Sequence, residues 1–439
     1  MPKAAHGWNA CDAIGAPAAP YRLAHPTDDG GEAYRVRYDH EETPAPTAAS
    51  ATIVTLQNAG RNFWHRTPTI IASEQMDRHK TRMFNANRFK LGLFAINCSG
   101  GLSLNKAPER WDASWDNNVK VTKLAEQAGL EFVLPIARWH GYRGDMDSHG
   151  ASWETLTWAT ALLAETDEIC VFATVHVPLI NPVLAAKQAV TADHASKGRF
   201  GVNIVSGWNA GEFAMFGVPL LEHDERYAYS EEWLTITKRI WSESEPFDFK
   251  GRYFDLKGVL SKPKPYGGSR PLLMSAGSSP VGSAFAARHA DCLFKVIIKL
   301  ESLGDELRAL RELAHPRPVG VYSSGHIVCR TTQKEAEDYY RFIVEEMADW
   351  DAVETMIDVR QNQKSIPPEL HRQIKERLVS GIGTFPIVGS PDYVAQVLCR
   401  LSDAGLDGMA FGLINYIDEL PLLRDELLPR MVRLGLRQD

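Results

Sequence analysis

The chain carries the stretch GRFGVNIVSGW at Gly198–Trp208, and this stretch decides the fold. Its centre, Phe200–Val205, is a short apolar run between glycines, which is typical of a buried parallel strand. Asn203 places an amide inside this run, where an amide needs a hydrogen-bond partner. Because α/β enzymes place their chemistry at the carboxyl ends of strands, Asn203 is a candidate site residue. The simpler alternative is a core asparagine with its hydrogen bonds satisfied.

The composition is that of a globular protein and argues against several classes of function. Of the 439 residues, 44% are hydrophobic and 23% are charged, and the net charge of -7 gives no electrostatic footprint for nucleic acid. No apolar run reaches the roughly 20 residues of a membrane helix, and no signal peptide is evident. The six cysteines and 14 histidines show no spacing typical of a metal site or a disulfide scaffold. We therefore expect a cytoplasmic protein without a metal.

Residues 1–82 differ from the rest of the chain. They are rich in alanine and proline or charged, with little apolar periodicity, and such a segment buries too little surface to offset its ordering entropy. We expect a poorly ordered extension, followed by one barrel domain at residues 83–439. Since Met83 lies just before the first convincing strand, the alternatives are a gene start placed too far upstream and a tail that packs on a partner subunit.

From Phe89 onward, short apolar runs alternate with longer amphipathic runs. The predicted strands are Phe89–Ile96, Glu131–Pro135, Glu168–Val175, Phe200–Val205, Pro271–Ser275, Cys292–Ile297, Pro318–Val328 and Met409–Leu413. The predicted helices are Trp115–Ala128 ended by Gly129, Ser152–Ala164 capped by Ser152, Pro182–Ala195, Glu222–Trp241, one opened by Ser279-Pro280, Gln333–Ala348, one opened by Ser390-Pro391 and Leu420–Leu434.

This alternation predicts an α/β fold, a (β/α)8 TIM barrel with insertions. The segment Phe249–Val259 predicts a hairpin outside the main sheet, and Val353–Gly383 predicts a mostly helical insertion. A doubly wound open sheet is the alternative fold, but no GxGxxG motif follows the first strand.

In a barrel, the side chains that follow the strands line the active site. These side chains are Ala137, Arg138 and His140 after the second strand, Thr174 at the end of the third, and Ser206, Trp208 and Glu212 after the fourth. Ordinary loop charges and satisfied β-formers are the simpler explanation of each residue taken alone. His223 and His326 are lone histidines, for which a structural role is the simpler explanation. No Ser-His-Asp order and no glycosidase-type carboxylate pair is evident.

A phosphate site is predicted after the fifth strand. Ser278-Ser279-Pro280 opens a helix there, and a helix start presents free backbone N–H groups to an anion. Arg226 can form a bidentate pair with a phosphate. Plain helix capping by Ser279 is the alternative.

Four motifs taken in order resemble the bacterial-luciferase-like flavin-dependent monooxygenases. They are GRFGVNIVSGWNAGEF from Gly198, LEHDERYAYSEEWL from Leu221, FDFKGRYFDL from Phe247 and SKPKPYGGSRPLLMSAGSS from Ser261. Within this family, the resemblance is greatest to the dimethyl-sulfone and pyrimidine (uracil) monooxygenases. It implies a TIM barrel, reduced FMN (FMNH2) delivered by a separate NAD(P)H:flavin reductase, and dioxygen as co-substrate.

The resemblance also implies roles for individual residues. Ala137 and Arg138 flank the flavin, and Asn203 and Glu212 contact the flavin or its ribityl chain. Thr174 and Asn203 form the small polar pocket that receives dioxygen, and they are the implied catalytic residues.

Three further residues, Arg226, Tyr227 and Ser279, are implied to hold the FMN phosphate. This chain has Pro280 in that stretch, and the proline removes one N–H that could face the phosphate.

The implied function is a two-component monooxygenase that inserts one oxygen atom into a small organosulfur compound such as a sulfone. The segments Asn97–Leu102 and Leu221–Tyr227 are nearer to the sulfone-oxidising members. The alternatives are ring opening of a pyrimidine or another heterocycle, a deazaflavin-dependent dehydrogenase, and a flavin-binding barrel without turnover. Members of the family are usually dimers or tetramers, so we expect a homo-dimer or homo-tetramer.

Overall fold

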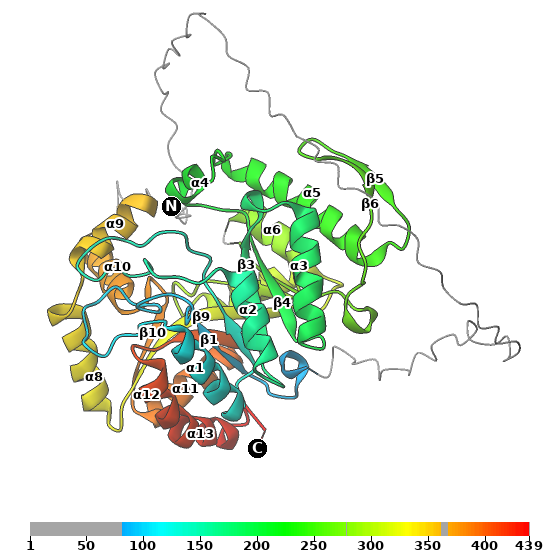
Figure 1. Cartoon of the computed structure of the whole chain (residues 1–439). Coiled ribbons are helices and arrows are strands. Elements are labelled where there is room, and N and C mark those ends of the chain that lie inside the picture. Colours follow the sequence, from blue (N-terminus) through cyan, green and yellow to red (C-terminus); the bar gives the residue numbers. More distant parts are fainter. Residues whose placement is uncertain (1–80, 278, 361–367, 439) are drawn as a thin grey trace, which may run out of the picture. The chain divides into compact units, whose positions relative to one another are not determined.

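A computed structural model describes residues 81–277, 279–360 and 368–438 (Figure 1). The predicted N-terminal extension falls almost entirely outside these residues and stays a prediction. The first described element is the 3₁₀ turn Arg82–Phe84. Its Arg82 donates hydrogen bonds to the carbonyls of Glu126, at 2.8 Å, and of Leu130, at 3.0 Å, which fix this turn to the barrel domain.

Within the described residues, nine parallel strands form the main sheet, and eight of them close into a ring. In ring order these are β1 (Lys90–Phe94), β2 (Phe132–Leu134), β3 (Cys170–His176), β4 (Phe200–Val205), β7 (Leu272–Ala276), β8 (Cys292–Phe294), β9 (Gly320–Cys329) and β11 (Gly408–Gly412). Pairing of β8 with β9, of β9 with β11 and of β11 with β1 closes the ring. The predicted TIM barrel is confirmed, and the doubly wound alternative is wrong.

Helices follow the strands along the chain (Figure 1). They are α1 (Trp115–Gln127), α2 (Thr155–Ala164), α3 (Pro182–Ala195), α5 (His223–Ser242), α6 (Pro280–His289), α7 (Leu303–Ala314), α8 (Gln333–Arg341), α11 (Pro391–Asp403), α12 (Tyr416–Leu422) and α13 (Leu428–Arg433). Gly129 ends α1 as predicted, at φ +78°. This left-handed backbone lets Leu130 donate its N–H to the carbonyl of Ala125 at 3.0 Å. Within the described ranges, no helix is both long and apolar enough to cross a membrane.

The predicted start of α2 at Ser152 is wrong. The helix begins at Thr155, and Glu154 caps it by accepting the N–H groups of Leu156, at 2.9 Å, and Thr157, at 2.8 Å. A carboxylate can accept two amides at once, and its negative charge is favoured at a helix start. The Ser152 hydroxyl instead donates to the carbonyl of Arg138 at 3.0 Å.

Among the described α-helices and strands, the sequence prediction lacks α4 (Ala210–Met215), α7 and β10 (Phe385–Gly389). Strand β10 pairs with Gly325–Cys329, the carboxyl half of β9. It uses the edge of β9 that β8 leaves free, because β8 spans only three residues.

The predicted hairpin outside the main sheet and the predicted helical insertion are both confirmed in the described residues. The hairpin consists of β5 (Phe247–Lys250) and β6 (Asp255–Val259), which form a separate antiparallel sheet. The helical insertion contains α9 (Trp350–Arg360) and α10 (Pro368–Gly381), and residues 361–367 between them lie outside the described part.

Aromatic side chains fill the barrel interior. The ring of Phe132 meets the rings of Phe172, at 6.0 Å, and Tyr322, at 5.8 Å, edge to face. Gly201 lies opposite Phe172 in the strand register, and a Cβ there would lie 2.4 Å from the Phe172 ring. Because side chains alternate along a strand, every second residue after these also faces the interior.

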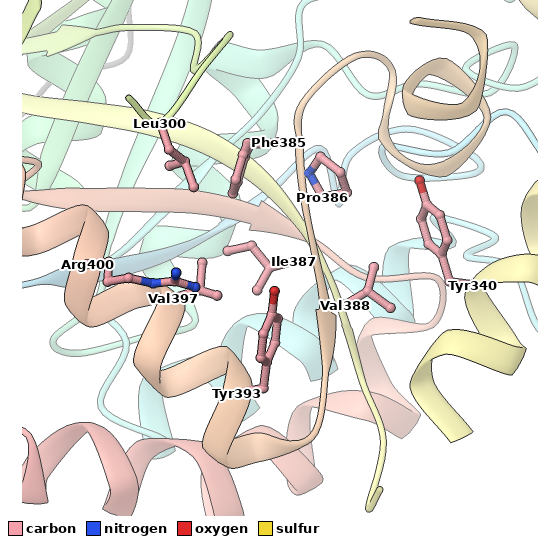
Figure 2. A pocket seen from close by; sticks show the side chains of 9 residues that line it. All are labelled: Leu300, Tyr340, Phe385, Pro386, Ile387, Val388, Tyr393, Val397 and Arg400. Atoms are coloured by element: carbon pink, nitrogen blue, oxygen red, sulfur yellow. The ribbon is translucent and has the colours of Figure 1, made fainter. Parts of the chain in front are cut away.

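A pocket of about 200 Å³ lies beside β10 (Figure 2). It is lined by Leu300, Tyr340, Phe385, Pro386, Ile387, Val388, Tyr393, Val397 and Arg400. None of these lining residues belongs to the predicted site, so this pocket is separate from it.

Candidate active site

The predicted catalytic pair is brought together on neighbouring strands. Thr174 and Asn203 lie directly opposite each other in the β3–β4 register, on the face that Phe172 and Gly201 turn to the barrel interior. The Asn203 amide donates to the Thr174 hydroxyl at 3.1 Å, and that hydroxyl donates to the carbonyl of Pro135 at 2.5 Å. Both residues are buried, with 6% and 7% of their surfaces exposed.

These hydrogen bonds fix the direction in which the Asn203 amide points. Since the Thr174 hydrogen goes to Pro135, the Thr174 oxygen must accept, and only the nitrogen of Asn203 can donate to it. The Asn203 carbonyl oxygen has no hydrogen-bond partner among the described residues. A buried, unpaired acceptor therefore remains available to a ligand.

Arg138 and Glu212, predicted from separate segments, form a buried ion pair. Arg138 Nη1 lies 3.0 Å from Glu212 Oε1, which also accepts the backbone N–H of Trp139 at 3.0 Å. Burial by itself lowers the pKa of Arg138, but the neighbouring Tyr142 and Glu212 outweigh it and raise that pKa. The guanidinium therefore stays charged, and Glu212 neutralises it.

Two aromatic rings flank the Arg138 guanidinium, Tyr142 at 5.0 Å and Trp208 at 5.3 Å. Arg138 Nε and Glu212 Oε2 have no hydrogen-bond partner within the part of the chain that the structure describes. The ion pair therefore keeps one donor and one acceptor for a ligand. Ala137, the other residue implied to flank the flavin, is buried next to Arg138 in the loop after β2.

The short helix α4 places Glu212 beside this loop. Its N-cap is Asn209, whose side-chain oxygen accepts the N–H of Gly211 at 3.1 Å and of Glu212 at 3.4 Å. An asparagine followed three residues later by glutamate is a helix-start pattern, and this pattern could have revealed α4 from the sequence.

The residues predicted to hold a phosphate lie at the starts of two neighbouring helices. A Cβ on Gly282 would lie 2.4 Å from the Tyr227 hydroxyl, so Tyr227 of α5 lies against the first turn of α6. Ser279 caps α6 and accepts the N–H of Gly282 at 3.1 Å. Residue 278, also named in the sequence prediction, lies outside the described residues.

Arg226 lies one residue before Tyr227 and donates to the carbonyl of Gly207. Its Nε has no partner in the described ranges, and burial lowers the pKa of Arg226. A Cβ on Gly277 would lie 2.3 Å from the Gly282 backbone, so a close backbone turn precedes the helix. An unpaired guanidinium N–H and a glycine turn at a helix start fit a phosphate.

His176 and His326 are two of the buried histidines at this end of the barrel, and neither was assigned a ligand-binding role from the sequence. His176 ends β3 on the same face as Thr174, and its Nδ1 has no partner among the described residues. Burial, aided by Arg138, lowers the pKa of His176 to about 4. It is therefore a neutral imidazole at neutral pH.

The other histidine, His326, lies four residues after Tyr322 on β9 and so faces the same interior. It is fully buried, and neither ring nitrogen has a partner in the described part of the chain. Burial is the main cause that lowers the pKa of His326, and the charge of Arg330 adds to it, so that this pKa falls to about 3. A structural role was the simpler expectation, but a buried histidine without partners indicates a ligand-facing group. The alternation along the predicted strand could have shown this.

In the described ranges, no three or more His, Cys, Asp and Glu side chains lie close enough together to hold a metal ion.

Known proteins are similar to this chain over most of its length. The family model described as luciferase-like monooxygenase matches residues 89–408. The FMNH2-dependent dimethylsulfone monooxygenase of Pseudomonas fluorescens (strain Pf0-1) is 32% identical over 349 residues, which cover 77% of this chain and 93% of that protein. The pyrimidine monooxygenase RutA of Bradyrhizobium sp. (strain BTAi1 / ATCC BAA-1182) is 30% identical over 61% of this chain and 73% of its own length.

Solved structures show the same fold. The crystal structure of DmoA from Hyphomicrobium sulfonivorans has a TM-score of 0.71, with 20% identity over 80% of this chain and 90% of that chain. The long-chain alkane monooxygenase LadA also has a TM-score of 0.71, with 20% identity over 81% of this chain and 94% of its own.

Proposed function

Because this chain belongs to the luciferase-like monooxygenase family, we propose that it is an FMNH2-dependent monooxygenase of a small organosulfur compound, most simply a sulfone. The flavin is FMN, supplied in reduced form by a separate reductase, and dioxygen is the co-substrate. The sulfone as substrate is supported by the dimethylsulfone monooxygenase that is 32% identical over 77% of the chain. The single observation that carries the mechanism is the buried Thr174–Asn203 pair with its unpaired amide oxygen.

Reduced FMN, when bound, supplies the electrons that activate dioxygen. The residues that would hold it are Ala137 and Arg138 beside the ring, Asn203 and Glu212 at its polar edge or ribityl chain, and Arg226, Tyr227 and Ser279 at its phosphate. Asn203 lies on the carboxyl half of a strand, and each of the other residues lies on a loop or helix start that follows a strand.

Thr174 and Asn203 contribute position and polarity. The Asn203 oxygen would accept a hydrogen bond from a bound flavin or substrate, and the second hydrogen of the Asn203 nitrogen would donate toward developing negative charge. Thr174 in this arrangement gives its hydrogen to Pro135 and would donate to a ligand only by leaving that carbonyl. The burial of both residues keeps bulk water away from them.

The charge balance of the site favours an uncharged substrate. Glu212 neutralises Arg138, and both His176 and His326 are neutral at physiological pH because burial lowers their pKa values. No net charge remains among these four groups to bind a sulfonate anion. A sulfone offers two neutral oxygen acceptors, which a neutral imidazole N–H can bind.

A coupled assay tests the proposed function. Purified protein is mixed with FMN, a generic NADH:flavin reductase and dimethyl sulfone, and the oxidised product is measured. We expect product only when the reductase is present. Product formation from NADPH without any reductase would contradict the two-component mechanism.

Uracil and methanesulfonate serve as parallel substrates in this assay. Ring opening of a pyrimidine is the second candidate function, because the pyrimidine monooxygenase RutA of Bradyrhizobium sp. matches 61% of the chain at 30% identity. Oxygenation of uracil but not of the sulfone would move the assignment to this second function.

The oligomeric state and the location are also proposals. We propose a homo-dimer or homo-tetramer in the cytoplasm. The five cysteines in the described ranges, Cys98, Cys170, Cys292, Cys329 and Cys399, are all free thiols, which suits a reducing compartment.

A further inference from the structure

A glutamate, a histidine and a lysine form a hydrogen-bonded chain between α5 and α6. His289 Nε2 lies 2.6 Å from Glu231 Oε1, and His289 Nδ1 lies 3.0 Å from Lys238 Nζ. Since the carboxylate can only accept, Nε2 carries the ring proton, and Nδ1 offers its lone pair to the lysine. This is the order of groups that activates a nucleophile in a catalytic triad, with an amine at its end.

This chain of groups lies at the opposite end of the barrel from the candidate active site. Arg270, Asp291 and Arg317 surround it, and they directly precede β7, β8 and β9. Thr174 and Asn203 lie on the carboxyl halves of their strands instead. The mechanism proposed above uses none of the groups in this cluster.

The surroundings favour the neutral form of the Lys238 amine. Burial is the largest cause, the charges of Arg270 and Arg317 add to it, and Asp291 and Glu231 oppose it, so that the pKa of Lys238 falls to about 8. The hydrogen bond from His289, with further help from Arg288, lowers the pKa of Glu231 to about 2 and keeps it a carboxylate. At pH 8 roughly half of such an amine is neutral, against less than about 1% of an ordinary lysine.

We propose that Lys238 is a site of covalent acylation by acyl phosphates, with His289 as the base and Glu231 as its positioning residue. The Nζ lone pair forms an amide bond with the acyl carbon. The bond from that carbon to the phosphate oxygen breaks, and phosphate leaves with the electron pair. The surplus proton on Nζ passes to His289 Nδ1 and then to solvent, and the Glu231 carboxylate stabilises the imidazolium between these steps.

The guanidinium groups favour a phosphate leaving group over a thiol. Arg270 is held by Asp291 at 2.6 and 2.8 Å. Arg317 Nη2 donates to the carbonyls of Ala287 and Ala290, both at 2.6 Å, but Arg317 Nη1 lies 4.0 Å from the Asp291 carboxylate and can still donate to a phosphate. A guanidinium N–H forms a charge-assisted hydrogen bond to a phosphate oxygen, which a thiol leaving group does not offer. Acyl phosphates are therefore preferred over acyl thioesters such as acetyl-CoA.

Peptide mass spectrometry tests the proposal on the full chain. The protein is treated with limiting acetyl phosphate from pH 6.5 to 9, and the acetylation rate of every lysine is measured. We expect Lys238 to react at least about tenfold faster than the exposed Lys250 at pH 8, with a half-maximal rate near pH 8. Acetyl-CoA at the same concentration is expected to label Lys238 more slowly.

Two variants separate a catalytic relay from a merely accessible lysine. His289→Gln keeps a side chain that can hydrogen-bond but cannot take the proton, and it is expected to lower the Lys238 rate at least fivefold without changing Lys250. Glu231→Gln is expected to give a smaller decrease. Thermal melting confirms that both variants are folded. Equal rates at Lys238 and Lys250 in the unmodified protein, or an unchanged Lys238 rate in His289→Gln, would overturn the proposal, and equal labelling by acetyl-CoA would overturn the preference for phosphate.

Discussion

The amide nitrogen of Asn203 lies 3.1 Å from the hydroxyl oxygen of Thr174, across the β3–β4 register, and the Asn203 carbonyl oxygen has no partner among the described residues. The pair is buried and oriented by the Pro135 carbonyl. Its hydrogen bonds hold the amide in one direction before any ligand arrives. Such preorganisation is what a site for developing charge requires.

Replacing Asn203 with alanine is expected to remove most of the oxygenation. The variant loses the only amide of the pair, and the loss of one preorganised polar group costs about 100-fold or more in kcat. The assay is product formation with saturating FMNH2, and thermal melting checks the fold. Asn117→Ala, on the outer helix α1, is the matched control and is expected to keep full activity. A fully active Asn203→Ala enzyme would remove the role assigned to the amide.

Two replacements of Thr174 separate the contribution of its hydroxyl from that of its side-chain volume. Thr174→Val keeps the volume but leaves the Pro135 carbonyl and the Asn203 amide without their partner, so we expect at least a tenfold loss of kcat and about 1–3 kcal/mol of lost stability. Thr174→Ser keeps the hydroxyl and is expected to remain within a few-fold of the parent. Steady-state kinetics and urea unfolding give the two readouts. Similar activity in both variants would show that the hydroxyl is dispensable.

The Arg138–Glu212 ion pair predicts a large effect on stability. Glu212→Ala leaves the buried guanidinium without its counter-charge, and breaking a buried pair in this way costs about 3–5 kcal/mol. Urea unfolding measures the change. The Glu168 side chain, the partner of Arg82, is 64% exposed, so Glu168→Ala is expected to cost less than about 1 kcal/mol. If both replacements lower the free energy of unfolding by the same amount, Glu212 does not act as a buried counter-charge.

The buried histidines predict that acid destabilises the folded protein. The pKa of His326 is about 3 and that of His176 about 4 in the folded state, against roughly 6.5 in the unfolded chain. The unfolded state therefore binds more protons, and the stability present above pH 6.5 is lost as the pH falls toward 4. His326→Gln is expected to reduce the change of the free energy of unfolding with pH by up to about 1.4 kcal/mol per pH unit.

The measurement for this prediction is the free energy of unfolding in urea at pH 7.5, 6 and 5. His223→Gln is the control, because His223 is exposed beside Asp224 at the start of α5. A parent protein whose stability does not change between pH 7.5 and 5 would contradict the prediction.

Local chemistry explains which elements could be predicted. Helix α3 spans Pro182–Ala195 as predicted, since a proline at the first position specifies its start within a few residues. Strand β4 spans Phe200–Val205 as predicted, because a buried parallel strand needs a continuous apolar run and glycines bound it. Ser279 and Ser390 cap α6 and α11 as expected, through bonds to the N–H groups three residues ahead.

Strand β10 could not be predicted in this way. It contains Pro386, which argues against a strand in a central position, and it pairs only with the carboxyl half of β9. That pairing exists because β8 ends after three residues and leaves the edge of β9 open. The length of one strand therefore decides whether a segment about 90 residues later becomes part of the sheet.

The sequence by itself determined the barrel, the strand ends that carry Thr174 and Asn203, and the helix starts that carry Arg226, Tyr227 and Ser279. These features depend on periodicity and capping, which act within a few residues. Only the tertiary structure decided that Glu212 neutralises Arg138, 74 residues earlier in the chain, and that His326 is buried without a partner. Contacts at such separations depend on how the whole barrel closes, and no local pattern records which buried groups meet or which remain unpaired.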